Sequence, residues 1–247
     1  MNLLSSFSIP VLIGLAAAAF LAGLARGFSG FGAALIFVPL ASALSSPKLA
    51  PPLLVIADGI FSSYLIPPAI GKINAREVGW MFAGALVGIP LGGAILSGMP
   101  VLPLRWLITG MVTTMLVLLM SGWRYHGQPK TWMTVLVGAV SGIFSGIAQI
   151  GGPPVVAYWF GIGTEPAILR ANVIAFFALG SVMSLIVYIW HGLIDWQILW
   201  LAVVIGPAYG VGTFLGSRLF GKASPRFFRN ICFVIIACAI IVSLPVY

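Results

Sequence analysis

The sequence contains very few charged residues. Lys, Arg, Asp and Glu make up 6% of the 247 residues, whereas hydrophobic residues make up 61%, and the mean hydropathy is +1.14. Water-soluble domains carry roughly 25% charged residues, so this chain cannot cover itself with a solvated surface. We therefore expect an all-α, polytopic, integral membrane protein of the cell inner (plasma) membrane, with almost no soluble part.

Several chemistries lack the residues that they require. No Gly-x-x-x-x-Gly-Lys-Ser/Thr loop for nucleotide phosphates is present. The two cysteines, Cys232 and Cys238, lie six residues apart in one apolar segment, which predicts neither a disulfide framework nor a metal site. The formal net charge of +8 comes without a contiguous basic patch outside the apolar segments. We expect no cofactor, no metal, no catalytic residue and no nucleic-acid partner.

Long apolar segments dominate what is present. A membrane-spanning helix needs about 20 apolar residues, and six segments are compatible with one crossing each: 49–70, 78–96, 104–122, 168–190, 197–219 and 230–246. Two further regions consist of mostly shorter pieces, 9–25 with 30–44 and 131–150 with 153–163. Residues 2–8 contain neither Lys nor Arg, so the first piece is expected to be a retained membrane segment rather than a signal peptide.

The two interrupted regions carry similar small residues. Residues 27–32 read Gly-Phe-Ser-Gly-Phe-Gly; residues 144–148 read Phe-Ser-Gly-Ile-Ala and are followed by Gly-Gly-Pro-Pro at 151–154. A helix break at membrane depth survives only where it lines a cavity, and a matched pair of breaks in two halves indicates a transport site. Close helix packing, which also favours Gly and Ser, is the alternative interpretation.

The chemistry of such a break suits an anion. A helix that restarts at membrane depth presents free N–H groups and a partial positive charge at its N-terminus. Pro153 suits a first helical turn, where no hydrogen-bond donor is lost. We predict a substrate site near the membrane midplane, formed by Arg26, Ser29, Gly30, Phe31, Gly32, Ser145, Gly146, Gln149, Gly151, Gly152, Pro153 and Asn172.

Weak internal repetition indicates a duplication. The motif at 71–74 recurs at 192–195, and the glycine-rich motif at 88–92 recurs at 212–216. We expect two membrane repeats, 1–125 and 126–247, of inverted topology, each opening with a broken helix or hairpin that is followed by three transmembrane helices. Whether each broken region is a re-entrant hairpin or two full crossings stays open.

The distribution of basic residues predicts the orientation. If each broken region returns to its starting side, only Lys48 and Arg105 lie on one side of the membrane, and Arg26 lies inside the first break. Because basic loops stay in the cytoplasm, both termini are expected outside, and the cytoplasmic set comprises Lys72, Arg76, Arg124, Lys130, Arg170, Arg218, Lys222, Arg226 and Arg229.

Two ionisable residues lie in strongly apolar surroundings. Asp58 is in the middle of segment 49–70, with Ser62 and Ser63 one helical turn later. Intramembrane charges are costly and indicate function by default. For Asp58 we consider proton or cation coupling, pairing with Arg26, or burial as a neutral acid. For Arg26 we consider direct substrate contact, a structural pair or interfacial anchoring.

These motifs resemble the TauE/SafE (TSUP) family of sulfite and sulfonate exporters. The resemblance rests on residues 27–32 leading to Val-Pro-Leu at 38–40, on Ser-Gly at 145–146 leading to 151–154, and on the glycine motifs at 88 and 212. It covers nearly the whole chain. The first half departs from the pattern by having Ala33 and Ala34 where more glycine is expected. The resemblance implies two related halves that export small sulfur-bearing anions such as sulfite or organosulfonates.

We therefore predict a secondary transporter, not an enzyme, that exports such anions and is coupled to protons through Asp58. A metal or cation permease would need intramembrane clusters of carboxylate, His or Cys. A membrane-embedded enzyme would need a nucleophile with a base, or a metal. A structural subunit would not need matched breaks. The expected partners are a small anion and the lipid bilayer, and the apolar helix surfaces are also compatible with a homodimer.

Overall fold

The computed structural model describes residues 7–128, 130–219 and 225–244, with the side chains of 225–228 left out. Lys222, which the predicted orientation uses, lies outside these residues, as do the first residues of the first predicted repeat and the last residues of the second. The described residues contain helices and no strand. The helices are α1 (Ile9–Ser29), α2 (Ala33–Leu44), α3 (Ala50–Phe61), η2 (Ser63–Leu65), η3 (Pro67–Lys72), α4 (Ala75–Gly98), α5 (Val101–Ser121), α6 (Thr131–Ala148), α7 (Gly152–Gly161), α8 (Pro166–Trp190), α9 (Trp196–Leu219) and α10 (Pro225–Ser243).

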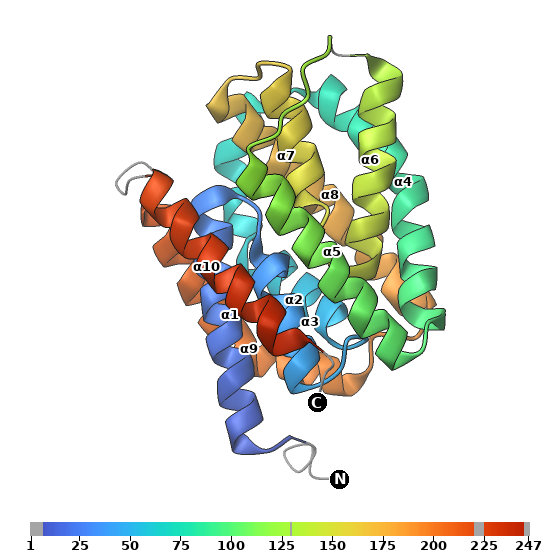
Figure 1. The fold of residues 1–247 in the computed structure, drawn as a ribbon, viewed down its shortest axis with the longest axis vertical. Helices are drawn as coiled ribbons and strands as arrows, with labels where there is room; N and C mark the ends of the chain where they lie inside the picture. The colour runs from blue at the N-terminus through green and yellow to red at the C-terminus, as the bar shows by residue number, and fades with distance from the viewer. Residues whose placement is uncertain (1–6, 129, 220–224, 245–247) are drawn as a thin grey trace.

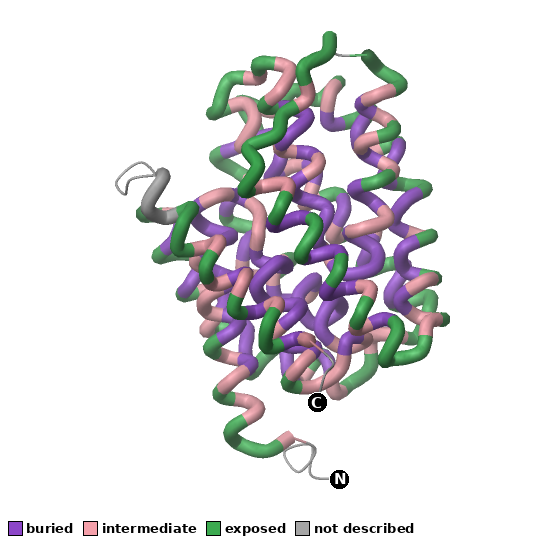
Figure 2. Tube along the Cα trace, viewed as in Figure 1, coloured by how far each residue is buried: buried purple, intermediate pink, exposed green. Residues whose placement is uncertain are grey.

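Six of these helices are long and apolar enough to cross a membrane: α1, α4, α5, α6, α8 and α9. The bent pair formed by α3 and the following 3-10 turns gives a seventh if it is counted as one span. Buried residues concentrate in the middle of the bundle and exposed ones at its periphery (Figure 2). Many exposed residues are large and apolar, including Trp190 and Val203, as expected for a lipid-facing surface. The prediction of an all-α, multi-pass membrane protein is confirmed.

The predicted single span 49–70 is bent. Helix α3 ends at Phe61, and the chain turns by 50° into the 3-10 helices η2 and η3. Pro67 and Pro68 follow closely, and proline cannot continue an α-helix because it lacks an N–H and its ring clashes with the preceding turn. The prediction missed a break that the sequence itself carries.

The two predicted breaks also lie slightly later than expected. Helix α1 runs through position 27 to Ser29, and α6 runs through Ser145 and Gly146 to Ala148. The actual breaks occupy residues 30–32 and 149–151. Figure 1 shows α1 entering from the lower end of the bundle and α6 from the upper end. Helices α2 and α7 then return toward the ends from which α1 and α6 came, so each broken region is a hairpin.

Glycines bring two helix pairs into backbone contact, α4 with α6 and α1 with α9. A β-carbon at Gly88 would collide with the Ala139 carbonyl, and one at Gly212 would collide with the Phe20 carbonyl. Small residues of this kind let transmembrane helices approach closely. Some glycines that were predicted to lie in the breaks, such as Gly146, therefore lie within a helix before the actual break, where they allow close helix packing.

The contacts of the two pairs correspond residue by residue. Gly146 lies against the Ile89 carbonyl, whereas Gly27 lies against the Thr213 carbonyl. The sequence spacing from position 27 to position 146 equals the spacing from 20 to 139. The spacing from 89 to 213 likewise equals the spacing from 88 to 212. Each pair joins one helix that precedes residue 125 (α1 or α4) to one that follows it (α9 or α6).

Candidate functional site

The two breaks meet at one small internal cavity of about 40 Å³. The starts of α2 and α7 line it, together with side chains from α1, α3 and α8. A cavity of this size exceeds the roughly 10–15 Å³ that a single water needs, so it has room for a small polar group. Six predicted site residues line it: Arg26, Phe31, Gly32, Gln149, Gly152 and Pro153.

The first turn of α2 supplies backbone donors to this cavity. Gly32 precedes the helix in the left-handed region, with φ of 94°, a conformation that glycine adopts without strain. The first N–H groups of a helix have no partner within it. Here the Leu35 N–H turns back to the Gly32 carbonyl at 3.2 Å. The N–H groups of Ala33 and Ala34 form no hydrogen bond with any residue that the structure describes, and both residues line the cavity.

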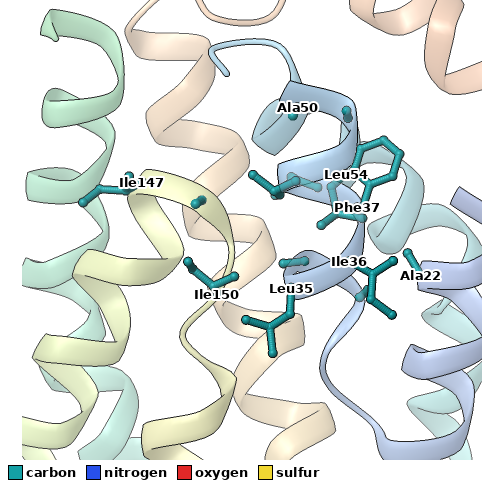
Figure 3. Close-up of a cluster of buried hydrophobic side chains, with 14 of the residues drawn as sticks. Ala22, Leu35, Ile36, Phe37, Ala50, Leu54, Ile147 and Ile150 are labelled. Carbon is teal, nitrogen blue, oxygen red and sulfur yellow. The ribbon is translucent and has the colours of Figure 1, made fainter. Parts of the chain in front are cut away.

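The start of α7 is poorer in donors. Pro153 and Pro154 occupy its first turn and carry no N–H, so Gly152 is the one donor among its first three residues. Figure 3 shows Ile150, from the break before α7, beside Leu35 of α2, and both residues line the cavity. The two hairpins thus contribute unequally, because α2 offers amides whereas α7 offers a rigid, largely apolar wall.

A buried ion pair forms one side of the cavity. Arg26 Nε lies 2.9 Å from Asp58 Oδ1, and the two side chains are only 7% and 15% exposed. Arg26 also donates to the Gly30 carbonyl, and its guanidinium lies 5.6 Å from the centre of the Phe177 ring. It is the one ion pair within residues 7–128, 130–219 and 225–244. Of the roles considered for Arg26 and Asp58, the structure shows their mutual pairing.

Asp58 is held by further donors. Its Oδ1 accepts from Ser62 Oγ at 2.7 Å and from Tyr209 OH at 2.5 Å. Asp58 Oδ2 and Arg26 Nη2 form no hydrogen bond with any residue that the structure describes. Each charged group therefore keeps one polar atom available while the pair lines the central cavity.

Gln149 fixes the second break. It has a positive φ of 61°, and its Nε2 donates to the Ser145 carbonyl at 2.8 Å and to Tyr188 OH at 3.0 Å. Tyr188 in turn donates to the Gly146 carbonyl at 2.9 Å. The phenol thus gives the Gly146 carbonyl near the end of α6 a partner, and the amide is a second donor to the Ser145 carbonyl, which also accepts from the Gln149 backbone N–H at 2.9 Å.

The predicted serines do not line the central cavity. Ser29 Oγ lies 2.7 Å from the Ala25 carbonyl and 2.5 Å from that of Phe31, so its single hydrogen stabilises the bend after α1. Ser145 Oγ is buried and forms no hydrogen bond within the described part of the chain. A β-carbon at Gly151 would collide with it and with Ser141 Oγ. Gly151 thus sits tightly against α6, outside the cavity wall.

Three other predicted residues also lie away from the wall. Gly30 ends α1 with φ of 79° and accepts from Arg26. Gly146 packs on α4. Asn172 is fully buried, and its Oδ1 accepts from the backbone N–H of Asn74 at 2.8 Å, which ties α8 to the start of α4.

Sequence reasoning missed the two tyrosines. Both are fully buried, Tyr188 near the end of α8 and Tyr209 in the middle of α9. A buried tyrosine nearly always hydrogen-bonds its hydroxyl, so their positions were a usable signal for polar partners at membrane depth. The identity of the partners depends on helix pairing, which the sequence did not reveal.

Comparison with known proteins identifies the family of the chain. Residues 15–243 match the family model described as sulfite exporter TauE/SafE. The chain belongs to the sulfite exporter TauE/SafE family. The probable sulfite/organosulfonate exporter TauE of Cupriavidus necator is 25% identical over 232 residues, which cover 88% of each chain. No solved structure matches the chain. The family consists of membrane exporters, not enzymes, and the resemblance inferred from the glycine motifs is confirmed.

Proposed function

We propose that this protein is a secondary transporter that exports small sulfur-containing anions, sulfite or organosulfonates, and binds them where α2 begins. The observation that carries the proposal is the meeting of both helix breaks at one cavity, lined by Arg26 and by Ala33 and Ala34, whose backbone N–H groups have no partner in the described part of the chain. The name of the Cupriavidus relative supports the same class of substrate.

The binding site has the electrostatics that an oxyanion requires. The Ala33 and Ala34 amides lie at a helix N-terminus, where the helix dipole adds partial positive charge. Arg26 and Asp58 cancel each other, so the empty site carries no net charge. An entering anion accepts hydrogen bonds from the amides and from Nη2 of Arg26. The planar guanidinium has enough N–H donors to form this bond while it keeps its existing ones.

An anion bound in this cavity lies close to the Asp58 carboxylate, because Asp58 lines the same space of about 40 Å³. Like charges repel strongly at such distances, and a proton on Asp58 removes the repulsion. In this scheme Asp58 takes up a proton when the anion binds, and Ser62 and Tyr209 keep its side chain in place.

Asp58→Asn should abolish the dependence of transport on a pH difference. One pH unit supplies about 1.4 kcal/mol per coupled proton, so the wild-type substrate ratio across the membrane should shift up to about tenfold. Asparagine keeps the acceptor for Ser62 and Tyr209 but carries no exchangeable charge. The measurement is substrate distribution in proteoliposomes at imposed pH differences. An unchanged response in the variant rules out coupling through Asp58.

The halves 1–125 and 126–247 act as inverted-topology repeats that rock about their hairpins. The corresponding contacts of α4 with α6 and of α1 with α9 support this scheme, as do hairpins that enter from opposite ends (Figure 1). The loops after η3, α5 and α7 lie at the upper end of Figure 1; this end is cytoplasmic and both termini are outside, in the plasma membrane. A potential of 100 mV, negative inside, favours export by about 2.3 kcal/mol for each net negative charge moved, so a divalent anion that leaves with one proton gains this amount.

The proposed function is tested by efflux of radiolabelled sulfite from proteoliposomes containing the purified chain. We expect saturable efflux that sulfoacetate and ethanesulfonate inhibit and that acetate and Ni²⁺ do not. Protein-free liposomes are the control. Efflux no faster than in the control, or stabilisation of the protein by Ni²⁺ alone in a thermal-shift measurement, contradicts the proposal.

A further inference from the structure

A second, larger cavity lies next to the central one. Its volume is about 310 Å³, and it is an open cavity bounded by parts of α1 and α2, the ends of α5 and α7, and the start of α10. Its wall is mostly apolar, but it contains two arginines, Arg124 and Arg229. Phe31, Gly32, Leu35 and Pro153 line both cavities, so a single layer of residues separates them.

The two arginines give the second cavity uncompensated positive charge. None of the four acidic residues of the chain lines it, and neither arginine forms an ion pair with any residue that the structure describes. The Arg124 guanidinium stacks 3.9 Å from the centre of the Phe160 ring, and that of Arg229 lies 5.9 Å from Phe233. Low-dielectric walls around like charges concentrate the opposite ion.

Backbone contacts hold Arg124 at the cavity. The Tyr125 N–H donates to the Ala157 carbonyl of α7 at 3.2 Å. Gly161 lies so close to the Tyr125 backbone that a β-carbon there would collide with it. The loop after α5 is therefore fixed on α7 at Tyr125, and the exposed Arg124 directly precedes this contact.

Phe31 occupies the boundary between the cavities. Its ring packs on Gly152, where an added β-carbon would lie 3.0 Å from Phe31 Cδ2. Gly30 and Gly32 flank it, both in the left-handed region with φ of 79° and 94°. Two glycines beside one bulky ring allow the ring to swing with little backbone strain, while Ser29 Oγ bonds its backbone in the present position.

We propose that the second cavity is the cytoplasmic vestibule of the transporter, that it collects small organic sulfonates, and that Phe31 is the gate to the central cavity. The sulfonate group binds Arg124 and Arg229, and the carbon body lies on the apolar wall formed by residues such as Leu118 and Phe233. Burial of each methylene improves binding about fourfold, so organosulfonates bind here better than inorganic anions. The inference rests on the proposed function for the direction of transport and for the class of substrate.

Cys232 lines the vestibule and serves as a reporter. In a Cys238→Ser chain, its thiolate attacks a methanethiosulfonate to form a mixed disulfide, with methanesulfinate as the leaving group. We expect the 2-sulfonatoethyl reagent to react faster than the 2-trimethylammonioethyl reagent. Arg124→Gln and Arg229→Gln should each slow the sulfonate reagent about threefold, the effect of one unit charge some 7 Å away in water-like surroundings, and should accelerate the cationic one.

Arg218→Gln is the matched control. Arg218 also stacks on a phenylalanine, with its guanidinium 4.3 Å from the centre of the Phe214 ring, but it does not line the vestibule. Its replacement should leave both labelling rates unchanged. Equal rates for the two reagents in the parent chain, or a loss with Arg218→Gln as large as with Arg124→Gln, overturns the assignment of the charges.

Protection separates the substrate classes. Propanesulfonate should slow labelling of Cys232 at lower concentration than ethanesulfonate, and ethanesulfonate at lower concentration than sulfate. Equal protection by sulfate, or none by the sulfonates, overturns the vestibule. Labelling from the outer face of oriented vesicles contradicts the orientation and with it the cytoplasmic assignment. Charge-selective labelling in a chain that shows no sulfite efflux would refute the proposed function alone.

A cysteine at position 34 reports on the gate, because Ala34 lines the central cavity and not the vestibule. In a chain without Cys232 and Cys238, the sulfonate reagent should modify Ala34→Cys at least tenfold faster after Phe31→Ala. Phe31→Trp, which enlarges the ring, should not accelerate the reaction. Identical rates with alanine, phenylalanine and tryptophan at position 31 exclude Phe31 as the gate.

Discussion

Gly88→Ala is expected to destabilise the bundle by about 3 kcal/mol or more, whereas Gly79→Ala on the same helix is not. A β-carbon at position 88 meets the Ala139 backbone carbonyl of α6, which cannot move aside as a side chain can. Overpacking in tight cores costs about 1–3 kcal/mol even when side chains can adjust. At position 79 no atom lies within 4 Å of the added carbon, and alanine favours a helix by about 1 kcal/mol over glycine.

Thermal unfolding of the purified variants in detergent measures this difference. Gly212→Ala on α9 should behave like Gly88→Ala, since its β-carbon meets the Phe20 carbonyl of α1 in the corresponding way. The account fails if Gly79→Ala and Gly88→Ala unfold at the same temperature, because the close contact of α4 with α6 would then contribute nothing.

Arg26→Met is expected to cost about 3–5 kcal/mol of stability, because it leaves the Asp58 carboxylate buried without its cation. Asp58→Asn alone should cost a similar amount by leaving Arg26 without its anion. The double variant leaves neither charge uncompensated, and asparagine still accepts from Ser62 and Tyr209. It should therefore recover at least half of the stability that either single variant loses.

Urea unfolding of the four proteins closes this double-mutant cycle. Tyr209→Phe is the comparison for a lost neutral donor, and it should cost about 1.5–3 kcal/mol through its bond to a charged acceptor. Strict additivity of the two single losses in the double variant contradicts an interaction between Arg26 and Asp58.

Much of the helical framework was predictable because apolar runs and breakers determine it. The segments after residue 75 correspond to single helices within a few residues at each end. The bend after Phe61 was missed because overall hydropathy masked Pro67 and Pro68. The breaks were placed too early because Gly27 and Gly146 look like breakers in the sequence. In the fold they are helical and contact a neighbouring helix, and only tertiary packing distinguishes these two uses of glycine.

The candidate site was predictable where the backbone defines it. Gly32, Gly152 and Pro153 lie at the starts of two helices, and they line the central cavity. Asn172 was predicted to be a site residue because of its position in the presumed repeat, yet in helix α8 its side chain contacts the start of α4. Tyr209 could not be assigned to Asp58, because that contact depends on the packing of α9 on α3.

The affinity of Ala34→Pro for sulfite tests the central claim most directly. The substitution removes one N–H from the first turn of α2. Proline is tolerated in a first turn, and Pro153 already occupies the same place in α7. Ala34→Gly keeps the N–H and is the control. A hydrogen bond to a charged group contributes about 1.5–3 kcal/mol, so the dissociation constant of Ala34→Pro should rise about 10- to 100-fold while that of Ala34→Gly stays within about threefold. Wild-type affinity in a folded Ala34→Pro protein would contradict binding of the anion at the start of α2.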